Sequence, residues 1–123
     1  MRIRRFSVAL PVGDLAAGRD FYVRHLGFRA AVDNDRVVKL LHDDPSYELV
    51  LVPRSGWEGT EGAVLALEVD DAAAEEERLR AEGVEITAPL RDEEWGERLF
   101  QVTDPNGVVV QPVQWIGGRP GDI

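Results

Sequence analysis

Few residues in this chain are suited to acid–base or nucleophilic chemistry. The sequence contains two histidines and no cysteine, which excludes disulfide scaffolds and cysteine-based zinc or redox sites. His25 falls in the last turn of a predicted helix, where a donor or cation complements the negative end of the helix dipole. His42 precedes Asp43 and Asp44 in a predicted turn, so we expect it to be exposed. Ser7 has no partner in sequence that resembles an activating base, and the sequence therefore predicts no catalytic residues.

The three tryptophans are the candidate binding groups. Trp57, Trp95 and Trp115 could form a stacking platform for a planar or cationic ligand. Two of them also have a structural alternative: Trp115 could be a core or dimer-interface residue, and Trp95 could anchor an acidic loop at 91–97. Trp57 lies between glycines in a connector that has nothing else to hold it, which makes it the best candidate for a lid.

The charge balance narrows the choice of partners. The net charge is -9 and the isoelectric point is about 4.6, so phosphate backbones and anionic membranes are repelled and cationic small molecules are attracted. We therefore expect no nucleic-acid or membrane partner. The uncharged stretch at 6–13 is too short to span a bilayer, and we expect a cytoplasmic protein.

An internal repeat organises the chain. Residues 8–17 align with residues 65–74 at a constant offset, with apolar residues alternating before Asp14 and Asp71. Each alternating run predicts a strand, each aspartate suits a helix N-cap, and the helices end at Gly27 and Gly83. Both halves thus begin with a strand, an Asp cap, a helix and a glycine stop.

Short β-branched runs follow each helix and complete the repeat. They predict strands at 28–32, 36–41 and 47–52 in the first half, and at 84–87, 97–103 and 108–115 in the second. The predicted fold is α+β, with two tandem βαβββ modules whose cupped mixed sheets carry helices outside. We expect one domain over 1–123, made of module one (1–54), a connector (55–61), module two (62–117) and a loose tail (118–123).

The ordered motifs resemble those of the vicinal oxygen chelate superfamily, which includes glyoxalase I, extradiol dioxygenases and bleomycin-resistance proteins. The motifs are Val12-x-Asp14, Phe21-Tyr22-x3-Leu26-Gly27-Phe28, Glu68-Val69-Asp70-Asp71, Trp95-Gly96 and Asp104-Pro105-Asn106-Gly107. The resemblance spans residues 3 to 116 and implies a homodimer, because superfamily members usually pair modules across a two-fold axis.

The same resemblance implies four metal-ligand positions at the bottom of the cup. They are occupied here by Ser7, Glu48, Val64 and Gln111. A borderline divalent metal needs three or four donors, preferably imidazole or carboxylate, and one carboxylate with one amide does not hold it. We therefore expect no bound metal and no cofactor, as in the metal-free bleomycin-resistance branch.

Strand parity in the family register then names the residues that could touch a ligand. The predicted ligand-binding residues are Ser7, Glu48, Trp57, Val64, Trp95, Leu99, Gln101, Gln111 and Trp115. Glu48 could pair with a donor such as Arg91 or with the ligand. The resemblance implies a metal-free small-molecule binding protein that sequesters a cationic or aromatic antibiotic-like ligand. The alternatives are a metal-dependent lyase, isomerase or dioxygenase-like enzyme of the same superfamily, and an interaction or regulatory module with a vestigial cup.

Overall fold

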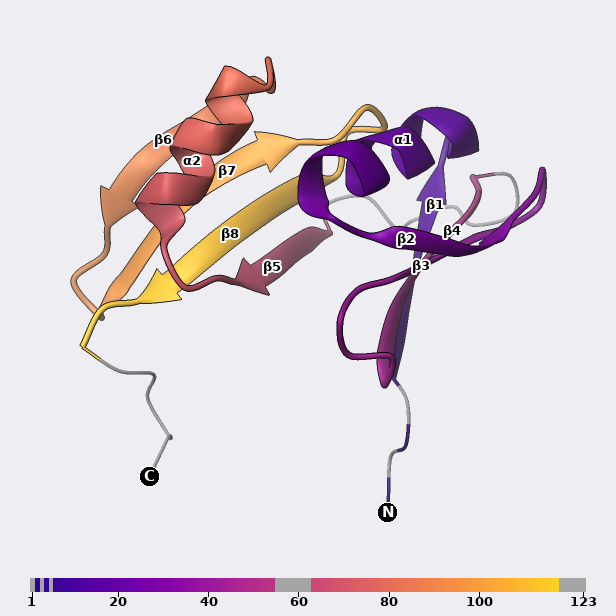
Figure 1. Ribbon diagram of the computed structural model, residues 1–123, viewed down its shortest axis with the longest axis horizontal. Coiled ribbons are helices and arrows are strands. Elements are labelled where there is room, and N and C mark those ends of the chain that lie inside the picture. The colour runs from indigo at the N-terminus through magenta and orange to yellow at the C-terminus, as the bar shows by residue number, and fades with distance from the viewer. Residues whose placement is uncertain (1, 3, 5, 55–62, 118–123) are drawn as a thin grey trace. The chain divides into compact units, whose positions relative to one another are not determined.

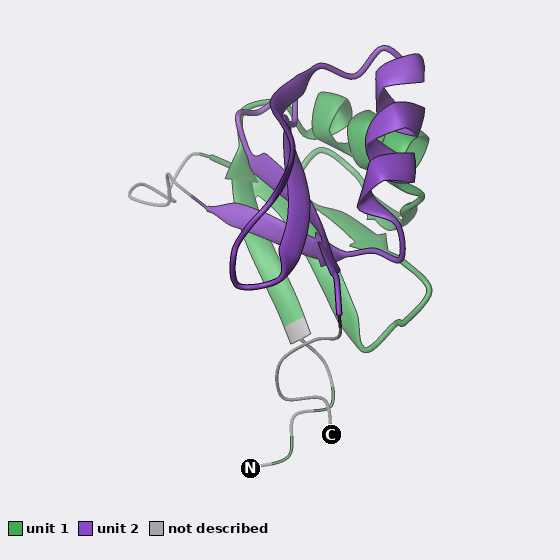
Figure 2. Cartoon of the chain, turned by 90° about the vertical axis from the view of Figure 1, so that its left-hand side faces the viewer, with its two compact units in different colours: residues 1–61 green, residues 62–123 purple. Residues whose placement is uncertain are grey.

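The chain divides into two compact units, unit 1 (residues 1–61) and unit 2 (residues 62–123), coloured separately in Figure 2. The computed structural model describes residues 2, 4, 6–54 and 63–117. Each unit has its own sheet and its own helix.

Unit 1 contains four strands and one helix (Figure 1). In chain order these are β1 (Phe6–Val12), α1 (Leu15–Leu26), β2 (Arg29–Asp33), β3 (Val38–Leu41) and β4 (Tyr47–Pro53). The sheet order is β1-β4-β3-β2, with β1 parallel to β4 and the other pairs antiparallel. The helix α1 packs against β2, β3 and β4, so it covers one face of this sheet.

Unit 2 repeats this arrangement with the same topology. Its elements are β5 (Val64–Glu68), α2 (Ala72–Ala81), β6 (Ile86–Asp92), β7 (Glu97–Thr103) and β8 (Val109–Trp115). The sheet order is β5-β8-β7-β6, with β5 parallel to β8, and α2 packs against β6, β7 and β8. The α+β fold with two tandem βαβββ modules is therefore confirmed.

The helix ends follow the sequence signals of the repeat. The Asp14 carboxylate accepts a hydrogen bond from Ala17 N at 3.0 Å, and Asp71 accepts one from Ala74 N at 3.1 Å. These contacts satisfy amides that have no partner inside the helix. Gly27 ends α1 with a φ of 77°, a left-handed conformation that favours glycine. Neither helix in the described part of the chain has the length and apolar character needed to cross a lipid bilayer.

Each unit has a separate core between its helix and its sheet. In unit 1, Tyr22 of α1 is fully buried with Leu40 and Leu51. In unit 2, Leu79 of α2 is buried with Phe100 and Val110. Because strand side chains alternate between faces, burying these residues under the helix sends their neighbours to the opposite face.

The largest departure from the predicted strand bounds is in β6. The prediction placed a strand at 84–87 and a loop at 91–97, whereas β6 runs from Ile86 to Asp92. Pro89 lies inside this strand and cannot donate a ladder hydrogen bond, a feature that disfavours a strand across this position. It is tolerated because β6 is an edge strand whose register with β7 shifts twice, between Ile86 and Ala88 and between Ala88 and Arg91.

Candidate functional site

Each sheet has one face that its helix does not cover, which we call the open face of that unit. In unit 1 the open face carries Ser7 and Ala9 of β1, with Glu48 and Val50 directly opposite them on β4. Lys39 of β3 lies opposite Val50 and belongs to the same face. Because side chains alternate along the strands, the predicted residues Ser7 and Glu48 both lie on the open face of unit 1.

Ser7 and Glu48 are hydrogen-bonded to each other on this face. The Ser7 hydroxyl donates to Glu48 Oε1 at 2.7 Å, with Ser7 exposed and Glu48 half-buried. The partner of Glu48 is thus Ser7, which lies 41 residues away in sequence and is brought close by the parallel pairing of β1 with β4. Arg91, one of the partners considered for Glu48, instead pairs with Glu93.

The open face of unit 2 combines apolar and amide side chains. The strand register places Ala66 opposite Gln111, and Leu99 opposite Val113. Val64, the one predicted ligand-binding residue on β5, is 52% exposed. Leu99 and Val113 are only 3% and 6% exposed, so they form the floor of this face.

Two of the predicted residues meet in a side-chain pair. Gln101 Nε2 on β7 donates to Gln111 Oε1 on β8 at 2.7 Å. Beside them the Thr103 hydroxyl donates to the Thr87 hydroxyl at 3.2 Å. The threonine pair was not predicted, since β6 was expected to end at Thr87 and no sequence signal fixed its register with β7.

Two tryptophans lie near one end of this sheet. Trp95, in the turn between β6 and β7, is 58% exposed and donates its indole N–H to the Glu97 carboxylate. Trp115 ends β8 directly opposite Glu97 and is half-buried. Glu97, the first residue of β7, is therefore hydrogen-bonded to the indole of Trp95 and lies opposite Trp115 in the sheet. The third candidate, Trp57, lies outside the described residues.

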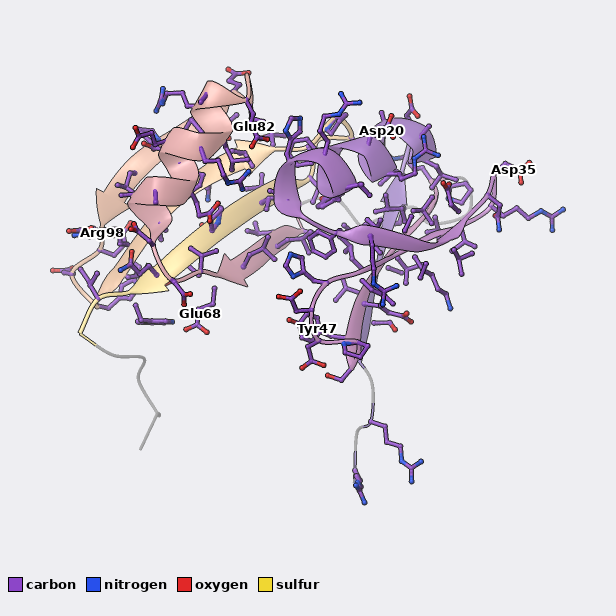
Figure 3. All side chains as sticks on the ribbon, viewed as in Figure 1. Asp20, Asp35, Tyr47, Glu68, Glu82 and Arg98 are labelled. Atoms are coloured by element: carbon purple, nitrogen blue, oxygen red, sulfur yellow. The ribbon has the colours of Figure 1, made fainter. Side chains whose placement is uncertain are left out.

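An ion pair ties β6 to the beginning of β7. Arg98 Nε donates to Asp92 Oδ1 at 2.7 Å, and Nη2 donates to Oδ2 at 3.1 Å. The hydrogen bond from this guanidinium holds the pKa of Asp92 below its ordinary value. Figure 3 labels Arg98, whose neighbours in sequence, Glu97 and Leu99, belong to the open face. Alternation therefore assigns Arg98 to the helix-covered side.

The histidines are structural in unit 1. His25 lies edge-on to Phe21 within the last turn of α1. His42 was expected to be exposed, which was wrong: it is half-buried, its Nε2 is 3.1 Å from Leu26 O, and its ring packs edge-on against Phe28. The contact with a carbonyl at the end of α1 explains this position, since that oxygen has no partner within the helix.

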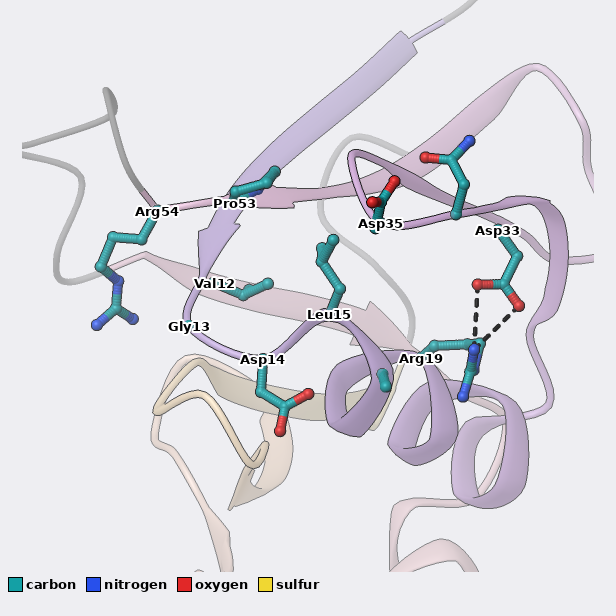
Figure 4. A pocket seen from close by; sticks show the side chains of 11 residues that line it. Val12, Gly13, Asp14, Leu15, Arg19, Asp33, Asp35, Pro53 and Arg54 are labelled. Carbon is teal, nitrogen blue, oxygen red and sulfur yellow. Dashed lines mark hydrogen bonds and ion pairs between the residues drawn. The ribbon is translucent and has the colours of Figure 1, made fainter.

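A hollow of about 810 Å³ lies in unit 1, away from these predicted residues (Figure 4). It is lined by residues 12–16, Arg19, residues 33–35, Pro53 and Arg54. Its polar groups are engaged in local structure: Asp14 caps α1, Arg19 pairs with Asp33 at 3.1 Å, and Asn34 Oδ1 accepts two backbone amides of its own turn. The hollow is thus framed by groups that already hold the turn and the helix start.

Each unit is a βαβββ module whose helix leaves one face of the sheet open, and this tandem repeat defines the class of protein. The chain matches the family model of the Glyoxalase/Bleomycin resistance protein/Dioxygenase superfamily over residues 4–111, and it belongs to that family.

Solved structures give the same fold. A glyoxalase/bleomycin resistance protein/dioxygenase from Nocardioides is 26% identical with a TM-score of 0.76, and the match covers 100% of this chain and 91% of that one. A superfamily member from Sphaerobacter thermophilus is 27% identical with a TM-score of 0.76, covering 89% and 95%. An antibiotic binding protein from Streptomyces is 27% identical with a TM-score of 0.75, covering 90% and 94%. No match to the sequence was found among curated proteins.

Proposed function

We propose that this chain is a metal-free small-molecule binding protein that sequesters a cationic or aromatic antibiotic-like ligand and releases it unchanged. The observation that carries the proposal is the chemistry at the four positions where the family resemblance implies metal ligands. Ser7 is hydrogen-bonded to Glu48, Gln111 is hydrogen-bonded to Gln101, and Val64 has no side-chain atom that could coordinate a metal.

These residues do not fit a divalent metal. A Zn²⁺ or Mn²⁺ site needs three or four donors, and here the set amounts to one carboxylate, one neutral amide and one hydroxyl. Glu48 Oε1 and Gln111 Oε1 already accept hydrogen bonds from side chains. Within the described residues, no group of three or more His, Asp or Glu side chains is arranged to hold a metal ion. No reaction step is therefore assigned to a metal here.

The charges on the open faces support a cationic ligand. Glu48 belongs to the open face of unit 1, and Glu68 and Glu97 belong to that of unit 2 by register with Val113 and Trp115. The net charge of -9 adds a long-range attraction for cations. Glu48 keeps one carboxylate oxygen that is not engaged with Ser7, and this oxygen can accept a hydrogen bond from an ammonium group.

The exposed indoles support an aromatic ligand. Trp95 is 58% exposed in the free protein, which leaves much of its ring available for stacking. A cation held over such a ring gains roughly 0.5 to 2 kcal/mol. The similarity to the antibiotic binding protein from Streptomyces, which extends over 90% of this chain, supports an antibiotic-like ligand.

The proposed working form is a cytoplasmic homodimer. Four strands, β1 and β2 in one sheet and β5 and β6 in the other, are edge strands of their own sheets. Edge strands present unpaired backbone N–H and C=O groups, which a second copy can cover in a symmetric oligomer. The absence of cysteine makes the fold independent of an oxidising compartment.

The test combines elemental analysis with a thermal-shift panel. Purified protein is screened against bleomycin, aminated aromatics, and anionic controls that include an alkyl phosphonate and a glutathione conjugate. A ligand at 100 times its Kd adds about 2.7 kcal/mol of stability, a rise of roughly 8 to 11 °C for a chain of this length. The expected hits are cations whose effect weakens between 50 and 300 mM salt.

Three results would contradict the proposal. One equivalent of Zn, Mn or Ni per chain after mild purification would place a metal in the site. Stabilisation by the anions alone would reverse the ligand class. Conversion of a bound hit, detected by mass spectrometry of the recovered ligand, would make the protein an enzyme.

A further inference from the structure

The pair formed by Gln101 and Gln111 has more hydrogen-bonding capacity than it uses. The two residues lie opposite each other on β7 and β8, next to the registered pair Val102 and Val110. Both side chains are half-buried, and one bond of 2.7 Å joins Gln101 Nε2 to Gln111 Oε1. Each glutamine amide has two N–H donors and an oxygen acceptor, so most of this capacity remains after the single bond.

The unused atoms are open to the solvent side of unit 2. No other side-chain hydrogen bond of Gln101 or Gln111 occurs among the described residues. No buried side-chain nitrogen or oxygen in that part of the chain lacks a partner. Gln101 Oε1 and Gln111 Nε2 must therefore reach the surface of the open face, above the buried floor of Leu99 and Val113.

The pair presents the same pattern whichever way the two amides are turned. If both amides are flipped, Gln111 becomes the donor in the shared bond and Gln101 the acceptor, and one carbonyl oxygen and one NH₂ group still remain unengaged. An acceptor next to a donor complements an amide, which carries an N–H and a C=O side by side. A carboxylate offers only acceptors and an ammonium only donors, so each leaves one member of the pair unmatched.

We propose that the Gln101–Gln111 pair is an amide-recognising subsite on the open face of unit 2, and that its ligand carries a primary carboxamide or lactam next to an apolar ring. The proposal rests on the proposed function, since it names a group on the ligand of the same site. The ring is placed by Ala66 and Val64 of β5, because Ala66 lies directly opposite Gln111 and Val64 is the next residue on the same face, about 7 Å along the strand. Both side chains are apolar and exposed, so they offer the ring an accessible surface and no further polar contacts.

Three probes with one ring system test the subsite: 2-naphthamide, 2-naphthoate and 2-naphthylmethylamine. Titration is followed by NMR through the side-chain NH₂ signals of Gln101 and Gln111 and the methyl signals of Ala66 and Val64. We expect 2-naphthamide to move both NH₂ signals and to bind at least tenfold more tightly than the other two probes.

Two variants separate recognition from a purely structural role. Replacing both partners together, Gln101→Leu with Gln111→Leu, removes the pair without leaving half of it unpaired, and should bring the three affinities within about twofold of one another. Gln111→Glu replaces the donor by a carboxylate and should transfer the preference to 2-naphthylmethylamine. Thr103→Val, which removes a different polar contact of the same face, is the matched control and should keep the preference for the amide.

The inference is overturned if 2-naphthoate or 2-naphthylmethylamine binds the parent protein as tightly as 2-naphthamide, or if the double variant keeps the preference. It is also overturned if no probe moves the Gln101 and Gln111 signals. Its failure differs from that of the proposed function, which is judged on the cation panel. If the protein binds those cations but shows no preference for the amide, only the amide subsite is refuted. If it prefers the amide but binds no cation, only the proposed positive charge of the ligand is refuted.

Discussion

Replacing Trp95 by alanine should weaken ligand binding while leaving the fold almost unchanged. An aromatic side chain presents roughly 150 to 250 Å² of surface, and with 58% of Trp95 exposed, about 90 to 145 Å² is available to a ligand. At about 25 cal/mol per Å², complete coverage would contribute about 2 to 4 kcal/mol. A planar ligand stacks on one face of the indole, so about half of this is realised.

The expected loss for Trp95→Ala is therefore about 1 to 2 kcal/mol, a rise in Kd of about 5- to 30-fold. Isothermal titration with the best hit of the cation panel measures this change directly. The melting temperature of the free protein should fall little, because the indole of Trp95 is mostly exposed and contributes one hydrogen bond, to Glu97, on the surface.

Val23→Ala provides the control for this experiment. Val23 is also an exposed apolar residue, at 41%, but it belongs to the helix α1 and not to an open face. Its replacement should leave Kd unchanged within about twofold. If Trp95→Ala binds the ligand as tightly as the parent does, or if Val23→Ala loses as much affinity, the ring of Trp95 is not part of the binding surface.

Three further predictions concern assembly, helix capping and an ion pair. Light scattering at micromolar concentration should give twice the chain mass of 13.7 kDa, and a mass of one chain would exclude the homodimer. Asp71→Ala should lower the free energy of unfolding by about 1 kcal/mol in urea titrations, because the first turn of α2 loses its acceptor, whereas an unchanged midpoint would show that the cap contributes nothing. Arg98→Gln should return the pKa of Asp92, measured by NMR titration, toward its ordinary value. Because that pKa is lowered in the folded protein, the pair stabilises at neutral pH and this contribution disappears as acidification protonates Asp92, so the variant's stability should depend less on pH; an Asp92 pKa unmoved by the substitution would refute the pairing.

The elements that recur in the repeat could be predicted because each carries its own local signal. Asp14 and Asp71 follow alternating strands and precede helical runs, and both cap their helices as expected. The glycine after α1 also has the positive φ that its position requires. Capping and alternation depend on neighbours within a few residues, which is why sequence alone defines them.

The contacts that were missed depend on pairing between distant strands. Glu48 accepts the Ser7 hydroxyl because β1 and β4 are parallel neighbours, although two strands and a helix separate them in sequence. His42 is half-buried because the chain returns to the end of α1. The length of β6 was underestimated because Pro89 breaks the expected strand pattern and only the edge position makes it acceptable. None of these features has a signal within a short window of sequence.

Because side chains alternate along β8, its even-numbered and odd-numbered residues have different roles. The even-numbered residues serve the architecture: Val110 is fully buried, and Gln114 Oε1 accepts the backbone amide of Ala72 at the start of α2. The odd-numbered Gln111 instead lies on the open face, where its amide pairs with Gln101 in the proposed ligand subsite. Point substitutions at odd positions can therefore change ligand specificity without disturbing the core. Inserting or deleting one residue would instead move the core residues to the open face and the ligand-facing residues into the core. A homologue that shares only the even-numbered residues of β8 therefore shares the fold of this protein, and those residues give no information about which ligand the homologue binds.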